Sequence, residues 1–276
     1  MDQALTFDRV DDVSKFDGCN TRGLEYRWDI FKRHLTKFQA GSAALDFGAG
    51  SLRESFDLIT RGYHVTSVDL DRDTLDTYKA KYNWPAEPIH ELIAGQDFSE
   101  AISRLGDRKF SIVTCFDVLE HLEDPVSVLK EISKHLNDDA RLFVTVPNGR
   151  TLFEIAWRID LIIAKRTGRY MRPGEPHLQC NSTAKWKAIF REANLSTVDH
   201  EMQIGFFANT AAALFQVPLS LSGRILRKLG INVDALSLSE RIVAKIAPSM
   251  DMLDRYSRFL KGLYGWNLFV LAKAVR

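Results

Sequence analysis

The fold of this chain is decided by the stretch Ala43-Ala44-Leu45-Asp46-Phe47-Gly48-Ala49-Gly50-Ser51-Leu52-Arg53. The pattern predicts a buried strand over 43–47, a glycine turn and then a helix start. Gly48 and Gly50 allow backbone dihedrals that other residues avoid, and they let a ligand approach the main chain without meeting a Cβ. The first N–H groups of the helix and its positive dipole end would face that ligand. Asp46 adds an acceptor that suits an amino-bearing ligand better than a diphosphate.

A second strand with an acidic end follows the glycine turn. The helix predicted over 52–60 ends at Gly62, and the strand over 63–71 carries Asp69 near its end. A carboxylate about 20 residues beyond a glycine loop holds the ribose of a bound nucleotide. A dinucleotide site also needs Gly or Ala at the sixth loop position, where this chain has Arg53. The pattern therefore speaks against a dinucleotide.

Four stretches over roughly residues 40–150 resemble the class I S-adenosylmethionine-dependent methyltransferases. They are 45–50, Val68-Asp69, Gly95-Gln96-Asp97-Phe98 and 110–122, of which the last is the most specific. Where the family commonly has a third glycine, this chain has Leu52. The resemblance implies an α/β fold with a Rossmann-like, seven-stranded and mostly parallel sheet that carries helical insertions. It also implies a methyltransferase of the small-molecule or glycan type.

The resemblance implies S-adenosylmethionine as cofactor, and an open α/β sheet places its ligand outside the carboxyl ends of the strands. Asp97 and Phe98 follow a strand predicted over 89–94. The resemblance places the adenine there, with the carboxylate accepting from its amino group and the ring covering its face. Asp97 can also cap the helix that follows, alone or together with its ligand role. The expected cofactor contacts are Asp46, Gly48, Gly50, Asp69, Leu70, Asp97, Phe98, Cys115 and Phe116.

Two histidines are candidates for a general base. His121 follows the strand predicted over 110–115, and His177 precedes a helix that begins near Ser182 or Thr183. The unperturbed pKa of an imidazole lies near neutrality, so either ring can take a proton from a substrate hydroxyl. Each has an alternative: His121 can shape the loop and the methionine pocket, as it often does in the family, and His177 can be a surface residue.

Cys115 is not expected to be a nucleophile. A second catalytic cysteine signal is missing, and a free cysteine is commonly a small buried hydrophobe. The three cysteines are widely spaced and odd in number, which argues for a reducing compartment and against a disulfide framework or a structural zinc site. We therefore expect no metal.

The net charge and the first dozen residues limit the partners and the location that we expect. The chain has 276 residues and a formal net charge of +1, so it lacks the basic excess of a protein that holds a long nucleic acid. The first dozen residues are charged and contain no apolar stretch, which argues against a secretory signal. A cytoplasmic protein without a nucleic-acid partner is the expectation.

We expect three parts in the chain. An N-terminal segment and cap helix occupy 1–40, the cofactor-binding core occupies 41–150, and the substrate-side half of the same domain occupies 151–276. Helical insertions are expected at about 151–180 and 205–264.

The cap helix carries an apolar stripe of Trp28, Phe31, Leu35 and Phe38. The resemblance places this helix beside the cofactor loop. Two arginines near its start, Arg22 and Arg27, either reach the cofactor carboxylate or lie in solvent.

The insertions are unusually apolar. Residues 151–167 look helical and apolar around most of the circumference, so this helix is buried or faces apolar material. Residues 203–223 carry no charge, but polar residues and Pro218 make a membrane span a poor interpretation. These segments can cover an apolar acceptor, a second copy of the chain in a homodimer, or a membrane surface with anionic lipid.

The sequence predicts methyl transfer to an oxygen of a small-molecule, sugar, glycan or lipid-like acceptor. The Asn/Asp-Pro-Pro-aromatic motif of amino-methylating enzymes is absent, which favours oxygen. Such an enzyme works by aligning an in-line displacement and excluding water. The alternative is a non-catalytic binding or partner subunit that keeps the fold.

Overall fold

The computed structural model describes residues 31–81, 90–152, 177–203 and 265–274, with scattered residues within 154–166, 206–214 and 245–260. Arg22, Arg27 and Trp28 of the predicted cap helix lie outside the described residues, as does most of the insertion expected at 205–264.

The core of the described chain is a seven-stranded sheet with the order β3-β2-β1-β4-β5-β7-β6. Strands β1 to β5 pair in parallel, whereas β7 runs antiparallel to both β5 and β6. The carboxyl ends of β1 to β6 and the amino end of β7 therefore share one edge, and the predicted mostly parallel sheet is confirmed. The strands are β1 (Ala43–Phe47), β2 (His64–Asp69), β3 (Glu91–Ala94), β4 (Phe110–Phe116), β5 (Leu136–Pro147), β6 (Leu195–Gln203) and β7 (Trp266–Lys273).

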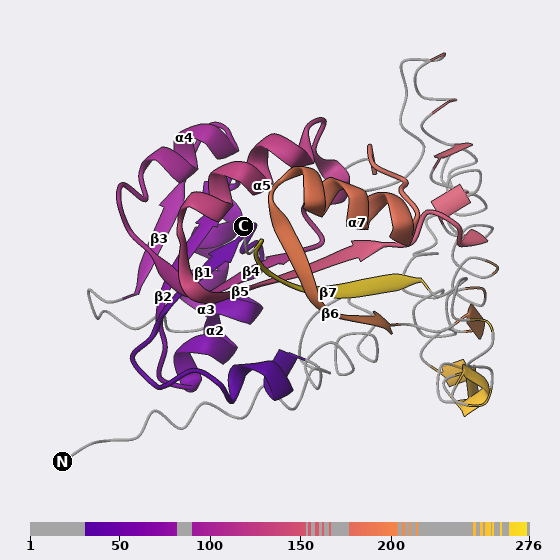
Figure 1. The fold of residues 1–276 in the computed structure, drawn as a ribbon, viewed down its shortest axis with the longest axis horizontal. Coiled ribbons are helices and arrows are strands. Elements are labelled where there is room, and N and C mark those ends of the chain that lie inside the picture. Colours follow the sequence, from indigo (N-terminus) through magenta and orange to yellow (C-terminus); the bar gives the residue numbers. More distant parts are fainter. Residues whose placement is uncertain are drawn as a thin grey trace, which may run out of the picture.

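Helices cover both faces of the sheet. In Figure 1, α4, α5 and α7 lie on one face, and α2, α3 and the helical residues 31–35 lie on the other. Parallel strands that are covered on both faces need apolar side chains on both, and β4 shows this with its nearly continuous burial. The described helices are α2 (Arg53–Thr60), α3 (Arg72–Lys81), α4 (Phe98–Ser103), the 3-10 helix η2 (Leu119–His121), α5 (Pro125–Lys134) and α7 (Thr183–Glu192).

Side-chain caps fix where three helices begin. Asp97 accepts a hydrogen bond from an N–H in the first turn of α4, and Asp124 does the same for α5, whose first residue is Pro125. Ser182 caps α7 in the same way. Each cap satisfies an N–H that the helix itself leaves without a partner, which is worth about 1 kcal/mol. These helix starts confirm the prediction.

The cap helix packs where its apolar stripe predicts. Phe31 and Leu35 are buried against the sheet face that also carries α2. The ring of Phe31 meets Phe116 and Phe143 edge-on, with centroids 5.7 and 4.7 Å apart. Fully burying side chains of this size is worth about 1.5–3 kcal/mol each. The helix is thus held close to the end of β4.

Strand β5 begins earlier than the sequence predicts. The residue pattern predicts a strand over 141–148, after the polar residues 137–139. In the structure they belong to β5 but are exposed, and the register between β4 and β5 shifts between Phe110 and Ile112. The irregularity absorbs the extra residues, and regular pairing resumes opposite Arg141.

In the described part of residues 151–167, apolar side chains are exposed and an acidic side chain is buried. Leu152, Ile155, Ile159 and Ile162 are helical and 42–53% exposed, whereas Glu154 is fully buried. Their spacing places the four apolar side chains on one face of a helix. The described residues therefore favour the second of the two predicted alternatives, a helix that faces apolar material. Within the described residues, no helix is both long and apolar enough to cross a membrane.

Candidate active site

The glycine turn after β1 adopts the backbone conformation that its sequence requires. Gly48 has φ +74°, and a Cβ there would lie 2.2 Å from Cγ2 of Val118. Gly48 and Ala49 both donate their N–H groups to the carbonyl of Val68. Gly50 has φ +42°, and a Cβ on it would meet the carbonyl oxygen of Gly48 at an unstrained 4.0 Å. Gly48 therefore allows close packing against the segment after β4, whereas Gly50 leaves room for a ligand.

The acidic end of β2 faces this turn. Asp69 accepts the N–H of Gly50 at 2.7 Å through Oδ2 and the N–H of Asp71 at 3.0 Å through Oδ1. Each carboxylate oxygen accepts more than one hydrogen bond, so Asp69 can also accept from a ribose hydroxyl. Leu70 beside it is 39% exposed and offers an apolar surface. Gly50, Asp69 and Leu70 therefore come together in an arrangement that suits a ribose, and their contact with the cofactor stays a prediction.

Asp46 is turned inward. Its carboxylate accepts from Ser55 at 2.5 Å and from Thr114 at 2.6 Å, and Ser55 also bonds to Ser67. Burial, followed by the charge of Glu54, raises the pKa of Asp46 to about 7. The side chain that the sequence offers as a ligand acceptor thus ties β1, β4 and α2 together beneath the glycine turn.

Leu52, at the position of the family's third glycine, adopts a backbone conformation that favours glycine. Its φ is 56° and its ψ is 16°, in the left-handed region. Such a conformation costs a non-glycine residue roughly 1–2 kcal/mol. The side chain is fully buried in a small cluster with Ala49, Phe56 and Leu75. Burial offsets the strain, so the turn keeps its shape without the glycine.

The segment after β3 combines a cap with a partly buried ring. Asp97 accepts from the N–H of Glu100 at 2.8 Å, which confirms the capping alternative, and its side chain is exposed beside the strand ends. The ring of Phe98 lies against Phe47 at the end of β1, with centroids 4.7 Å apart. This contact places Phe98 next to the glycine turn, where its role in covering the adenine stays a prediction.

The last residues of β4 point into the two cores. Cys115 is fully buried on one face, and its burial raises the pKa of the thiol well above the usual value, which fits the expectation that it is no nucleophile. Phe116 is buried on the other face against Phe31. Their side chains pack the sheet, so contact of either with the cofactor stays a prediction.

Asp117, directly after β4, fixes the strand end. Its φ is 57°, again in the left-handed region. Its Oδ1 accepts from Oγ1 of Thr145 at 2.8 Å and from Nε1 of Trp266 at 3.0 Å. One carboxylate thus joins β4, β5 and β7 at the edge where the site lies. Strained backbone of this kind is concentrated at functional sites.

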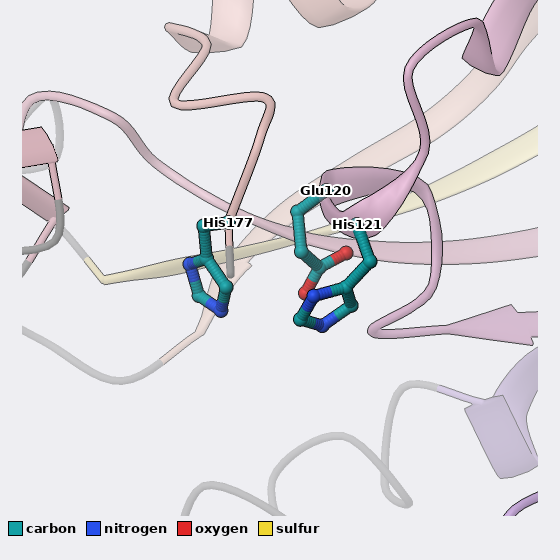
Figure 2. A group of neighbouring side chains, drawn as sticks. All are labelled: Glu120, His121 and His177. Carbon is teal, nitrogen blue, oxygen red and sulfur yellow. The ribbon is translucent and has the colours of Figure 1, made fainter. Parts of the chain in front are cut away.

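His121 and His177, the two base candidates, lie side by side. Their ring centroids are 5.0 Å apart and the rings are nearly perpendicular. Figure 2 shows them converging with Glu120 from two segments, η2 and the stretch before α7. Gln179 holds the segments together, because its N–H donates to the carbonyl of Glu120 and its side-chain amide donates to the carbonyl of Leu122.

A buried carboxylate orients His177. Nδ1 of His177 lies 3.0 and 3.1 Å from the two carboxylate oxygens of Glu154. An ionised carboxylate only accepts hydrogen bonds, so Nδ1 is the donor of this pair. In a neutral imidazole the lone pair then lies on the other nitrogen, Nε2. The sequence analysis did not assign Glu154 to the site, although a lone acid among apolar residues is a signal that could have identified it.

Comparisons with known proteins find relatives among the methyltransferases. A family model described as a methyltransferase domain matches residues 22–200. The ubiquinone biosynthesis O-methyltransferase of Marinobacter nauticus is 24% identical over 200 residues, which is 70% of this chain and 75% of that protein. The enzyme of the same name from Aeromonas salmonicida is 31% identical over 108 residues, covering 39% of this chain and 44% of its own length.

A solved structure shows the same fold. A [4+2]-cyclase covers 91% of this chain and 81% of its own, with a TM-score of 0.55 and 14% identity. Because folds of this kind host several chemistries, that likeness bears on the fold alone. The match over 22–200, which spans more than half of the chain, shows the family. With its 3-2-1-4-5-7-6 sheet and glycine turn, this chain belongs to the class I S-adenosylmethionine-dependent methyltransferases, whose cofactor is S-adenosylmethionine.

Proposed function

We propose that this methyltransferase acts on an oxygen of a small-molecule acceptor, whose hydroxyl loses its proton at the cluster of Glu120, His121 and His177. The observation that carries the proposal is the meeting of two histidines from distant segments at the strand ends. The cluster adjoins the glycine turn, because Val118 packs against Gly48 and its carbonyl accepts the N–H of His121 at 3.0 Å. A proton acceptor and the cofactor site thus lie on neighbouring segments.

The chain's residues divide into two groups of roles. Gly50, Asp69 and Phe98 would bind and orient the nucleoside. When bound, S-adenosylmethionine supplies an electrophilic methyl group on a sulfonium and retains the carbon–sulfur electrons as a neutral thioether. His177, oriented by Glu154, and the neighbouring His121 are placed to receive the proton that the acceptor oxygen gives up as it gains the methyl group. Such proton transfer typically contributes about 10²–10⁴-fold to the rate.

Calorimetric titration tests the first part of the proposal. S-adenosylmethionine and S-adenosylhomocysteine should bind with micromolar affinity, and NAD should not bind. Failure of all three to bind would favour the alternative of a non-catalytic partner subunit. Sugar, lipid and quinone-type hydroxyl acceptors can then be screened for methyl transfer.

Substitution of the histidines tests the second part. With an active acceptor, His177→Gln should lower kcat by about 10²–10⁴-fold and leave cofactor affinity unchanged. His64→Ala is the matched control, because His64 is an exposed histidine at the amino end of β2, away from the strand ends. An unchanged kcat for His177→Gln and His121→Ala would remove the proton-transfer role.

Four exposed apolar side chains on the helical segment after β5 support a lipid-like acceptor and contact with a membrane surface. We call them the exposed stripe (Leu152, Ile155, Ile159 and Ile162). Ile155 and Ile159 belong to the stripe, and the exposed Arg158 and Arg166 on the same helical segment suit anionic headgroups. Flotation with anionic vesicles should carry the protein upward, and the double variant Ile155→Ser/Ile159→Ser should reduce that fraction. A wholly soluble protein that sediments as a dimer would instead assign the stripe to a second copy. The cytoplasmic location stays a prediction.

A further inference from the structure

We propose that Glu120, His121 and His177 bind a divalent first-row transition-metal ion of the Zn²⁺ type. One ligand atom from each of the three residues lies within 4.8 Å of the other two, and Glu120 and His177 are buried. Figure 2 shows the carboxylate and the two imidazoles converging on one another. The set is two imidazoles and one carboxylate, which is a recurrent set of protein ligands at catalytic zinc sites.

The contact between His177 and Glu154 is a second, independent observation in favour of a metal. Histidines that ligate metals almost always donate their other ring N–H to a carboxylate, a carbonyl or water, which fixes the ring and strengthens the ligand. Here Nδ1 of His177 meets both oxygens of the fully buried Glu154. Nε2 is then the nitrogen that can bind a cation.

The backbone holds the two ligand-bearing segments in place before any ion binds. Gln179 bonds to the carbonyls of Glu120, Leu122 and Glu123 through its main-chain and side-chain N–H groups. Ligand bonds of about 2.0–2.1 Å in a tetrahedral site imply donor atoms about 3.4 Å apart. The cluster therefore contracts on binding, and the half-buried His121 is its least buried member.

The ligand chemistry selects the ion. Imidazole nitrogens suit zinc, iron, nickel and copper, whereas Mg²⁺ and Ca²⁺ prefer oxygen ligands. The sequence analysis expected no metal because it considered only the cysteines, and these three residues replace that expectation. Three protein ligands leave at least one coordination position for another group.

The location of the acceptor rests on the proposed function. An acceptor hydroxyl bound to the cation would lose its proton to solvent, because a metal ion lowers the pKa of a coordinated oxygen. The imidazoles then serve as ligands, and the oxygen keeps its electron pair for the methyl group. The cation would thus replace the imidazoles in removing the acceptor proton, while the acceptor oxygen, its place at the cluster and the methyl transfer of the proposed function stay the same.

Titration with Co²⁺ tests the site without reference to activity. Protein without a histidine tag, treated with a chelator and dialysed, should bind one equivalent of Co²⁺ with visible absorption bands. Zn²⁺ should displace the Co²⁺ and Mg²⁺ should not. Glu154→Gln should weaken Co²⁺ binding by about 10–100-fold, because it removes the carboxylate that orients His177. All three metal ligands stay in place in this variant. His177→Gln and His121→Ala should weaken Co²⁺ binding further.

His64→Ala is the control and should bind Co²⁺ like the parent protein. Thermal unfolding verifies that each variant is folded, and the milder Glu154→Gln keeps the test decisive if a ligand variant is not. Absence of Co²⁺ binding, displacement by Mg²⁺, or equal affinity in parent, His121→Ala and Glu154→Gln would overturn the metal site. Binding of S-adenosylmethionine in the same preparation is measured separately, so the failure of this inference and of the proposed function are distinguishable.

Discussion

The carboxylate of Asp69 accepts the backbone N–H of Gly50 at 2.7 Å, which ties the end of β2 to the glycine turn after β1. The same carboxylate borders the exposed side chain of Leu70. One residue therefore shapes the turn and is placed to bind a ribose, and substitutions can separate these two contributions.

Asp69→Ala should weaken the binding of S-adenosylmethionine by about 1.5–3 kcal/mol, the typical worth of a hydrogen bond to a charged group. Calorimetry measures this loss, and urea unfolding measures what the lost contact to Gly50 costs the fold. Asp73→Ala is the control, because Asp73 is an exposed acid in the first turn of α3. Unchanged affinity in Asp69→Ala would contradict the assignment of the ribose site.

The two glycines of the turn should respond differently to alanine. Gly48→Ala places a Cβ 2.2 Å from the Val118 side chain, so we expect a loss of stability of about 1–3 kcal/mol or more. Adding Val118→Ala should restore part of that loss. Gly50→Ala brings a Cβ no closer than 4.0 Å to the carbonyl oxygen of Gly48, so it should cost only about 1–2 kcal/mol of stability through its positive φ.

Among the variants that fold, cofactor affinity should fall more in Gly50→Ala than in Gly48→Ala. Gly50→Ala should weaken S-adenosylmethionine binding even though the variant stays folded, because the added methyl group occupies the space of the ligand. Thermal unfolding and calorimetry on the same samples measure both quantities. Tight binding by Gly50→Ala would place the cofactor away from this turn.

Leu52 should tolerate glycine at least as well as alanine. Either change removes a buried side chain, at a cost of about 2–5 kcal/mol for Leu→Ala in a core. Glycine also removes the strain of a positive φ, worth roughly 1–2 kcal/mol, so Leu52→Gly should be no less stable than Leu52→Ala. Leu75 is the control, since it is buried in the same cluster but lies within α3, where glycine should cost about 1 kcal/mol more than alanine. Urea unfolding of the four variants decides.

Asp46 should make the free energy of unfolding depend on pH. Its pKa is raised to about 7 in the folded chain and returns toward 3.8 on unfolding, so the folded state holds a proton that the unfolded state releases. The contribution to stability is complete below pH 3.8 and is lost as the pH rises to about 7.

Asp46→Asn removes this titration and keeps the shape of the side chain. The unfolding free energy of the variant minus that of the parent should rise between about pH 4 and 7, by up to about 1.4 kcal/mol per pH unit. Urea unfolding at several pH values measures the difference, in which all other groups cancel. A difference that does not change with pH would show that the Asp46 pKa is close to its usual value.

The parts of the fold that follow from local rules were predicted well. Strand β1 and the caps of α4, α5 and α7 depend on side chains within a few residues, and the sequence places them correctly. The start of β5 was wrong, because the bulge that absorbs residues 137–140 depends on its pairing with Phe110 and Ile112 of β4. Sheet pairing is a long-range property that local polarity does not report.

The candidate site divides in the same way. Single residues such as Asp69, His121 and His177 could be chosen because their types and positions suit the chemistry. Their grouping depends on how the segment before α7 packs on η2, which no local pattern specifies. Glu154 was missed because its partner His177 lies 23 residues away in the sequence, and the contact between the two side chains emerges from the fold.

The antiparallel position of β7 between β5 and β6 has a consequence for the order of events during synthesis. Strand β6 leaves the ribosome before β7, its neighbour in the described sheet, has been synthesised. Until Trp266–Lys273 is translated, β5 and β6 each present an open hydrogen-bonding edge, and such edges pair readily with other chains. During this period strands β1 to β5 of the nascent protein can assemble, whereas β6 cannot yet pair with β7. Chaperone capture and misassembly should be concentrated in that interval.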